Sequence, residues 1–213
     1  DAGIGPGDKV LVPAYHCSSM VEPVIWAGAT PVFYRIQANT AINLDDVASK
    51  LDERCKLLMA TNYFGFPQDL AALREFCDRR GLLLLEDCAH SFLGQHKGRP
   101  LGSWGDYAIA SSMKFFPLYE GGLLVSARRP LDKVQQQPAG LAFEAKAMIN
   151  TLEDGFSHGR LRVLRALTYV PMKLKSLLWR QIKARRQPNA QPLAPGSSDG
   201  GFGFDPRWLD KRS

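Results

Sequence analysis

The stretch Leu82-Leu83-Leu84-Leu85-Glu86-Asp87-Cys88-Ala89-His90 decides the fold. Four consecutive leucines form a near-continuous apolar run, which is typical of a strand buried on both faces of a parallel sheet. The preceding segment, Asp69–Arg80, places apolar side chains at helical spacing, and Gly81 follows as a stop signal. The sequence therefore predicts a helix followed directly by a buried strand, which is the repeating element of α/β proteins.

Similar apolar runs, each bounded by turn residues, recur on both sides of this stretch. They lie at Lys9–Pro13, Thr30–Tyr34, Leu57–Thr61, Tyr107–Ala110 and Gly122–Ser126. Helices are predicted from about Ser18 to Ala27 and from about Asn43 onward, and Gly98–Gly102 suggests a hairpin-like excursion. We therefore expect an α/β fold with a mostly parallel central sheet and helices on both of its faces.

The composition is that of an ordinary globular protein. The chain has 213 residues, of which 45% are hydrophobic, enough for one substantial core. No apolar run approaches the roughly 18 residues that cross a bilayer, and no secretory leader pattern opens the chain, so we expect a cytoplasmic protein. The four cysteines lie in or beside apolar segments without paired metal-ligand spacing, which predicts reduced, buried thiols and no metal site. They are Cys17, Cys55, Cys77 and Cys88.

The net charge of +6 is concentrated in one region. Nine Lys or Arg and no acidic residue lie between Arg160 and Arg186, so the rest of the chain carries about −3. No nucleic-acid motif accompanies this charge, which makes nucleic-acid binding the least favoured interpretation. Residues 141–182 are predicted to be helical, and the basic region, Arg160 to Arg186, is amphipathic and interrupted at Pro171.

Three interpretations of this basic region remain open. Its apolar face could pack on another part of the protein or on a dimer partner, which is the interpretation that we favour. Trp179 and the leucines could instead dip into anionic lipid at a membrane surface. Arg160 or Arg162 could also bind a phosphate or a nucleotide sugar.

The pattern divides the chain into three parts. Residues 1–135 carry the alternating strands and helices, residues 136–186 the helical basic segment, and residues 187–213 a Pro/Gly/Ser-rich linker with the start of a further domain. The chain opens without Met on a turn that leads straight into a strand. We therefore expect missing segments on both flanks and an active site that is incomplete in this chain alone.

Asp87 is the first candidate for a functional side chain. Ligands of open α/β sheets bind beyond the carboxyl ends of the strands, and the leucine run delivers Asp87 and His90 to that edge. A carboxylate and an imidazole three residues apart could face one ligand. The alternative is that Asp87 caps the following turn and that His90 is an ordinary edge histidine.

Lys114 is the second candidate. It lies in the segment Ser111-Ser112-Met113-Lys114-Phe115-Phe116, whose apolar side chains are expected to desolvate the ammonium group and favour the neutral amine that attacks an aldehyde. The two serines could hydrogen-bond a phosphate. The alternative is a lysine that extends past its apolar neighbours into water.

Both candidates belong to an ordered set of motifs. The set comprises Gly3–Pro13, Ala27–Phe33, Asn62–Asp69, Glu86–His90, and Lys114 six residues before Glu120-Gly121-Gly122. In this order it resembles the DegT/DnrJ/EryC1/StrS family of sugar aminotransferases, whose loop and strand-end motifs read His-Leu-Tyr-Gly-Gln-Pro-x-Asp and Glu-Asp-Ala-Ala-Gln. The resemblance runs from Gly3 to about Ser126 and implies a pyridoxal-phosphate enzyme of fold type I.

The resemblance implies a role for each candidate. Lys114 would bond covalently to the aldehyde of pyridoxal 5'-phosphate and later move a proton between substrate and cofactor. Asp87 would keep the pyridine nitrogen protonated, and His90, which replaces the family's Gln, would lie near the phenolic oxygen. The reaction would transfer an amino group from an amino acid, commonly glutamate, to the keto group of a nucleotide-linked sugar, in a homodimer.

Two positions depart from the family's pattern. Ile109 stands where the family has a phosphate-binding Ser, and Ser111 or Ser112 would substitute for it. The aromatic residue that stacks on the cofactor is also missing from its usual place. The residues that would replace it are Cys17, His16 and Tyr15.

Other functions remain open. The arrangement Asp-x-Ala-His-Ser at residues 87–91 also resembles the α-oxoamine synthases, which keeps acyl transfer open. Dehydration is a further possibility within the family, although some of its dehydratases have a different residue in place of the lysine, so Lys114 favours amino transfer. Outside enzymes, the alternative is a catalytically inactive binding or scaffold protein.

Overall fold

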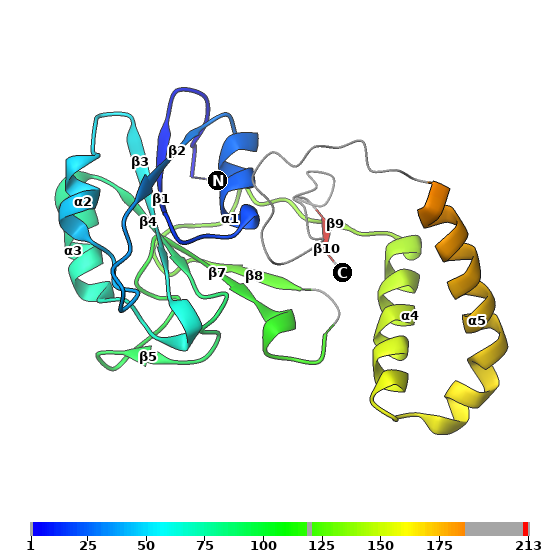
Figure 1. The fold of residues 1–213 in the computed structure, drawn as a ribbon. Helices are drawn as coiled ribbons and strands as arrows, with labels where there is room; N and C mark the ends of the chain where they lie inside the picture. The colour runs from blue at the N-terminus through cyan, green and yellow to red at the C-terminus, as the bar shows by residue number, and fades with distance from the viewer. Residues whose placement is uncertain (1, 119–120, 186–210, 213) are drawn as a thin grey trace. The chain divides into compact units, whose positions relative to one another are not determined.

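The computed structural model describes residues 2–118, 121–185 and 211–212. They belong to two compact units, one within residues 1–138 and 194–213 and the other within residues 139–193 (Figure 1). The first unit contains the predicted sheet. The second contains the predicted basic helical region.

A six-stranded sheet forms the centre of the first unit. In spatial order its strands are β2 (Thr30–Tyr34), β1 (Lys9–Pro13), β3 (Cys55–Thr61), β4 (Leu83–Asp87), β7 (Tyr107–Ser111) and β8 (Gly122–Val125). The first five run parallel, and β8 pairs antiparallel with β7 at the edge. The predicted α/β class and mostly parallel sheet are therefore confirmed. Each predicted strand also lies within two residues of its observed bounds.

Helices cover both faces of this sheet (Figure 1). They are α1 (Ser18–Trp26), α2 (Leu44–Ser49) and α3 (Leu70–Arg80). Val47, Leu70 and Phe76 of α2 and α3 belong to one buried cluster, whereas Val21 and Val24 of α1 belong to a second. Each helix thus buries one apolar stripe against the sheet, as its spacing predicts.

Local sequence signals set the ends of these helices. The side chain of Asn43 accepts a hydrogen bond from Asp46 N (3.0 Å) before α2, and that of Asp69 accepts one from Ala72 N (3.4 Å) before α3. Gly81 ends α3 with a φ of 65°, a left-handed conformation that residues with a Cβ rarely adopt. The chain can therefore turn sharply out of α3 into β4.

Two pairs of short strands lie outside the main sheet. β5 (Gln95–His96) and β6 (Arg99–Pro100) form an antiparallel hairpin, which overlaps the predicted excursion. β9 (Gln137–Pro138) pairs in parallel with β10 (Lys211–Arg212), a contact that the sequence did not predict. Apart from β10, the predicted linker at residues 187–213 lies outside the described residues.

A buried ion pair ties α3 to the sheet. Arg74 Nη1 lies 2.8 Å from Asp106 Oδ2, and both residues are buried. The same oxygen accepts a hydrogen bond from Leu84 N in β4 (2.9 Å), and Arg129 Nε lies 3.1 Å from Oδ1. Burial alone would raise the pKa of Asp106, but the backbone hydrogen bond and the arginines outweigh it and lower that pKa. The ionised carboxylate therefore joins α3, β4 and the segment after β8.

The second unit contains two helices among its described residues, α4 (Leu141–Ser157) and α5 (Arg162–Arg185) (Figure 1). The predicted helical region is confirmed. The predicted interruption at Pro171 is wrong, because α5 continues through this residue. Proline removes one backbone hydrogen bond from a helix interior, and a 24-residue helix tolerates this loss because its other turns keep theirs. No helix among the described residues is both long enough and apolar enough to cross a membrane.

Candidate active site

Parallel pairing brings the carboxyl ends of five strands to one edge of the sheet, and four of these strands lead into candidate residues (Figure 1). β1 ends at Pro13, β3 at Thr61, β4 at Asp87 and β7 at Ser111. In the register of these strands, Asp87 pairs with Thr61 on one side and with Ile109 on the other. These strand ends and the segments that follow them carry every residue that the sequence singled out for catalysis or cofactor binding.

The carboxylate of Asp87 is buried and held by two hydrogen bonds. Thr61 Oγ1 donates to Oδ2 across the pair of strands (3.2 Å), and the backbone N–H of Ala89 donates to Oδ1 (2.9 Å). The second bond is the local cap that was the alternative interpretation of Asp87. Because a carboxylate offers about four lone-pair sites, two bonds fix its orientation and leave capacity for a ligand.

Glu86, next to Asp87 in β4, has a structural role that the sequence analysis missed. Its side chain is fully buried and accepts hydrogen bonds from backbone and side-chain amides. The donors are Gly102 N (2.7 Å), Trp104 N (3.1 Å), Gly105 N (3.4 Å) and Asn62 Nδ2 (3.3 Å). Side chains of adjacent strand residues point to opposite faces of a sheet. Glu86 therefore anchors the segment before β7 on one face, and Asp87 lies on the other. An acidic residue inside an apolar strand was the signal that could have revealed this role.

Aromatic side chains join the segments that follow β1, β3 and β4. The ring of Tyr15 lies 5.3 Å from that of Tyr63 and 6.4 Å from that of Phe64, and Phe64 stacks on His90 with 6.0 Å between centroids. The hydroxyl of Tyr63 donates a hydrogen bond to Tyr15 O, and burial raises the pKa of this hydroxyl, which keeps it protonated as a donor. Phe64 has a φ of 55°, an uncommon left-handed conformation of the kind that clusters at functional sites.

His16 and Cys17, the other candidates after β1, have different neighbours. His16 stacks on Phe33 of β2, with 4.8 Å between centroids and 16° between planes. Cys17 is half-buried, not buried as predicted, because it lies in the turn between β1 and α1; the other three cysteines are buried thiols. Among the three candidates for stacking on a flat ligand, Tyr15 is the one that belongs to the aromatic group with His90 in the described part of the chain.

Lys114 ends a short 3-10 helix, Ser112–Lys114, that directly follows β7. The next two residues, Phe115 and Phe116, contact Phe92, with ring centroids 5.6 and 5.1 Å apart. Phe92 comes two residues after His90, in the segment that follows β4. These contacts therefore hold the lysine segment beside the segment that begins at the buried carboxylate.

The sequence predicts that apolar side chains shield Lys114 from water, and this prediction is wrong: none of the described residues encloses its ammonium group. Lys114 and Met113 are exposed, and so are Phe115 and Phe116, to 43% and 42%. The two rings contact Phe92 instead of enclosing the ammonium group. The alternative interpretation, a lysine that extends into water, is therefore the one observed. The amine of Lys114 is accessible to an incoming ligand.

Ser111 and Ser112, the candidate phosphate ligands, are half-buried at the end of β7. Ser112 N donates to Gly121 O (3.2 Å), and a Cβ placed on Gly121 would come within 2.3 Å of Ser112 Oγ. Gly121 also has a φ of 136°. A side chain at this position would therefore strain the backbone and displace the Ser112 hydroxyl, which explains the glycine.

The sequence pattern of the DegT/DnrJ/EryC1/StrS aminotransferase family matches residues 1–145. The chain is similar to a GDP-perosamine synthase from Vibrio cholerae, with 35% identity over 127 residues, which are 58% of this chain and 35% of that protein. It is also similar to the crystal structure of the aminotransferase TlmJ from Streptoalloteichus hindustanus, with a TM-score of 0.56 and 35% identity over 59% of this chain and 35% of that one.

A third similarity concerns the fold alone. An E. coli GDP-4-keto-6-deoxy-D-mannose-3-dehydratase with bound hydrated PLP matches with a TM-score of 0.53 at 24% identity. The match covers 58% of this chain and 32% of that one. The chain thus spans about a third of the length of the proteins to which it is similar.

Proposed function

This chain belongs to the DegT/DnrJ/EryC1/StrS aminotransferase family, and we propose that the whole protein transfers an amino group from an amino acid, glutamate in the first instance, to a keto group of a nucleotide-linked sugar. The observation that carries the proposal is the placement of Asp87 and Lys114. Asp87 ends β4, and Lys114 follows the neighbouring parallel strand β7 at the same edge of the sheet. A carboxylate and an amine in this arrangement can engage two positions of one flat cofactor.

The side chains at this edge suit pyridoxal 5'-phosphate, the cofactor of this family. Asp87 would hold the protonated pyridine nitrogen, because its carboxylate is buried and already oriented by Thr61 and Ala89. His90, stacked on Phe64, would lie near the phenolic oxygen. A carboxylate in a low-dielectric setting favours the pyridinium form far more than one in water does.

The remaining contacts to the cofactor come from β1 and β7. Ser111 and Ser112 would donate hydrogen bonds to the phosphate, since both hydroxyls lie at the end of β7, close to Lys114 in the chain. Tyr15 would stack on the ring, with His16 and Cys17 as the alternatives. The aromatic group that links Tyr15 to His90 supports this order of preference.

Proton transfer is the step that the protein itself performs. When bound, pyridoxal phosphate supplies an electron sink for the carbon that loses a proton. Lys114 would accept that proton at Nζ and deliver it to the cofactor carbon on the other side of the amino nitrogen. This role requires an amine that can move between two positions, and the long, exposed side chain of Lys114 has that freedom.

Relatives support the nucleotide-sugar part of the proposal. GDP-perosamine synthase, whose name includes a GDP-linked sugar, shares 35% identity over the matched residues. We further propose a homodimer, as the resemblance implies, and a cytoplasmic location, as the sequence pattern suggests. Acyl transfer, dehydration and an inactive scaffold are the competing functions, and the products of the reaction distinguish them.

Absorbance of the full-length protein tests the proposal. Wild-type protein purified with pyridoxal phosphate is expected to show a visible band from its covalent bond to Lys114, and borohydride should fix the cofactor to the protein. Lys114→Ala should lose the band. Lys133→Ala removes an exposed lysine outside the site and should keep it.

Product analysis completes the test. Glutamate added to the holoenzyme should yield 2-oxoglutarate and the aminated cofactor, and a keto sugar nucleotide should then restore the original spectrum. A wild-type protein without the band would contradict the enzyme proposal and leave the scaffold. A band without amino transfer would leave acyl transfer or dehydration.

A further inference from the structure

Helix α5 of the second unit carries an exposed apolar face. Apolar residues recur along it at intervals of three and four, which places them on one side of the helix. We name this the leucine face; it consists of Val163, Leu167, Leu174, Leu177 and Leu178. All five side chains are more than half exposed, Val163 and Leu167 to about three quarters.

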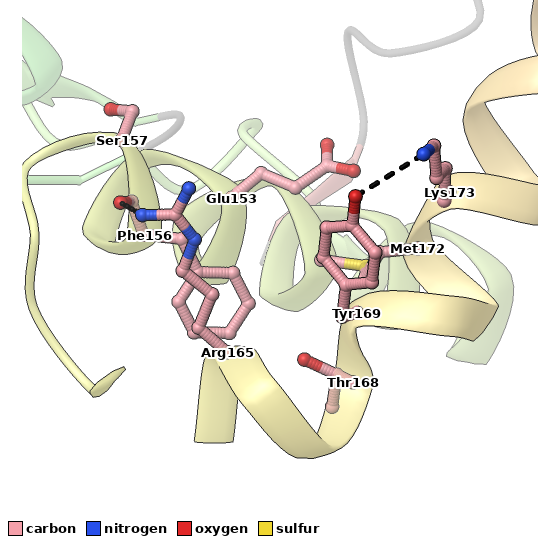
Figure 2. Close-up of a pocket in the computed structure, with 8 residues that line it drawn as sticks. All are labelled: Glu153, Phe156, Ser157, Arg165, Thr168, Tyr169, Met172 and Lys173. Carbon is pink, nitrogen blue, oxygen red and sulfur yellow. Dashed lines mark hydrogen bonds between the residues drawn. The ribbon is translucent and has the colours of Figure 1, made fainter. Parts of the chain in front are cut away.

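The opposite side of α5 makes the contacts with α4 (Figure 2). The α5 residues around the cavity of about 390 Å³ between the helices are Arg165, Thr168, Tyr169, Met172 and Lys173. Arg165 Nη1 donates to Phe156 O of α4 (3.3 Å), and Lys175 Nζ pairs with Glu153 Oε1 (2.8 Å). Within the second unit, the side of α5 that faces α4 thus mixes polar residues with Tyr169 and Met172 and does not include the leucine face.

In an ordinary helical hairpin the apolar stripes of the two helices face each other, whereas here the leucine face of α5 stays exposed. Burial of leucine side chains is the main driving force of helix packing. Because α4 contacts the opposite side of α5, the leucine face is available for a surface outside this hairpin.

The charge of the second unit indicates which kind of surface the leucine face can bind. Residues 139–193 contain ten Lys or Arg and only three Asp or Glu, and no acidic residue lies between Arg160 and Arg186. A second copy of the same face would set like charges against each other, and lysine is depleted in protein interfaces. Anionic lipid headgroups supply the opposite charge, and the acyl boundary beneath them accepts leucine side chains.

We propose that α5 binds the surface of an anionic membrane. The leucine face would lie at the boundary between headgroups and acyl chains, as in other interfacial amphipathic helices. Arg162 is exposed and lies beside this face at 100° per residue, where it can reach lipid phosphates. This binding is separate from amino transfer and uses none of the residues at the carboxyl edge of the sheet.

Flotation of the full-length holoenzyme with lipid vesicles tests the proposal. Vesicles of phosphatidylcholine with about 30% phosphatidylglycerol should bind at least about tenfold more protein than vesicles of phosphatidylcholine alone. Sodium chloride at about 0.5 M should remove most of this difference by screening. The triple variant Leu167→Gln/Leu174→Gln/Leu178→Gln should bind the anionic vesicles about tenfold less, and glutamine keeps the helix propensity of α5.

Leu141→Gln is the matched control, because Leu141 is a 90% exposed leucine of α4 outside the leucine face. It should bind vesicles as the wild type does. Equal binding of the wild type to both vesicle types, or to neither, would overturn the proposal even if the triple variant fails to fold. Two further outcomes assume that the wild type does not bind lipid. If the triple variant then has a lower oligomeric mass than the wild type, the leucine face binds a second copy of the chain. If the triple variant instead has a lower Tm, the leucine face packs on the rest of the chain.

Discussion

Thr61 and Asp87 connect two neighbouring strands at the candidate active site: the hydroxyl of Thr61 donates a 3.2 Å hydrogen bond to Oδ2 of Asp87. The two residues are also register partners in the β3–β4 pair, and both are buried. The orientation of the carboxylate therefore depends on the register of the sheet as well as on the local turn.

Thr61→Val is expected to weaken cofactor binding. Valine keeps the shape of threonine and removes the hydroxyl that orients Asp87, and a hydrogen bond to a charged group contributes about 1.5 kcal/mol, or about tenfold in Kd. Titration of the full-length apoprotein with pyridoxal phosphate measures the change. Thr61→Ser restores the donor and should recover most of the affinity; equal affinity of the valine variant and the wild type would contradict this role.

Asp87→Asn should nearly abolish amino transfer with little loss of structure. The amide keeps the size of the side chain but removes the charge, and the loss of one partner from a buried ion pair costs about 3 kcal/mol or more, which corresponds to a loss in rate of about a hundredfold. Stopped-flow absorbance of the half-reaction with glutamate measures it. Asp45→Asn, at an exposed position of α2, is the control and should leave the rate unchanged. Full activity of Asp87→Asn would exclude Asp87 as the pyridinium partner.

Asp106→Asn should lower stability in a pH-dependent manner. The pKa of Asp106 is lowered in the folded protein, so its contribution to stability is present above the unfolded pKa, near 3.9, and is lost as the pH falls through the lower folded value. At pH 7 the variant should lose about 2 kcal/mol of unfolding free energy, because Arg74 loses its buried partner and keeps the exposed Asp78, 2.8 Å away. Urea unfolding across a pH series measures the difference from the wild type, which should shrink below about pH 4. A difference that is constant with pH would contradict the ion-pair explanation.

Gly105→Ala should destabilise the sheet. A Cβ on Gly105 would lie 2.3 Å from Tyr107 O and 2.8 Å from Leu84 O, and these backbone atoms are fixed in neighbouring strands. We expect a loss of about 2 kcal/mol or more in unfolding free energy. Gly155→Ala is the matched substitution inside α4, where a Cβ meets nothing within 4 Å, and it should stabilise its helix by about 0.5 to 1 kcal/mol. Similar midpoints of urea unfolding for Gly105→Ala and the wild type would show that the strands can separate at this point.

The strands and the main candidate residues could be predicted because they depend on local pattern. Strands buried on both faces need apolar runs, and the sequence contains them at the observed positions. Asp87 and Lys114 stand out because each is a polar residue at or just after the end of such a run. Their roles stay predictions, since they depend on a cofactor that the family implies.

The contacts of Glu86 could not be predicted, because they depend on parts of the chain that only the folded register brings together. Its backbone donors lie 16 to 19 residues later, and Asn62 lies 24 residues earlier. The contact of Tyr63 with Tyr15 spans 48 residues. Composition also could not reveal that the rings beside Lys114 would contact Phe92, or that α5 would turn the side opposite its leucine face toward α4.

The order of the strands along the chain has a consequence for synthesis on the ribosome. Asp87 closes β4, whereas β7, which pairs with β4, is complete only at Ser111. At about 5 to 20 residues per second, one to five seconds separate the translation of these two points. During this interval β4 presents an unpaired edge that a strand of another nascent chain can occupy. The arrival of β7 pairs this edge of β4 and completes the part of the sheet that carries the candidate active site.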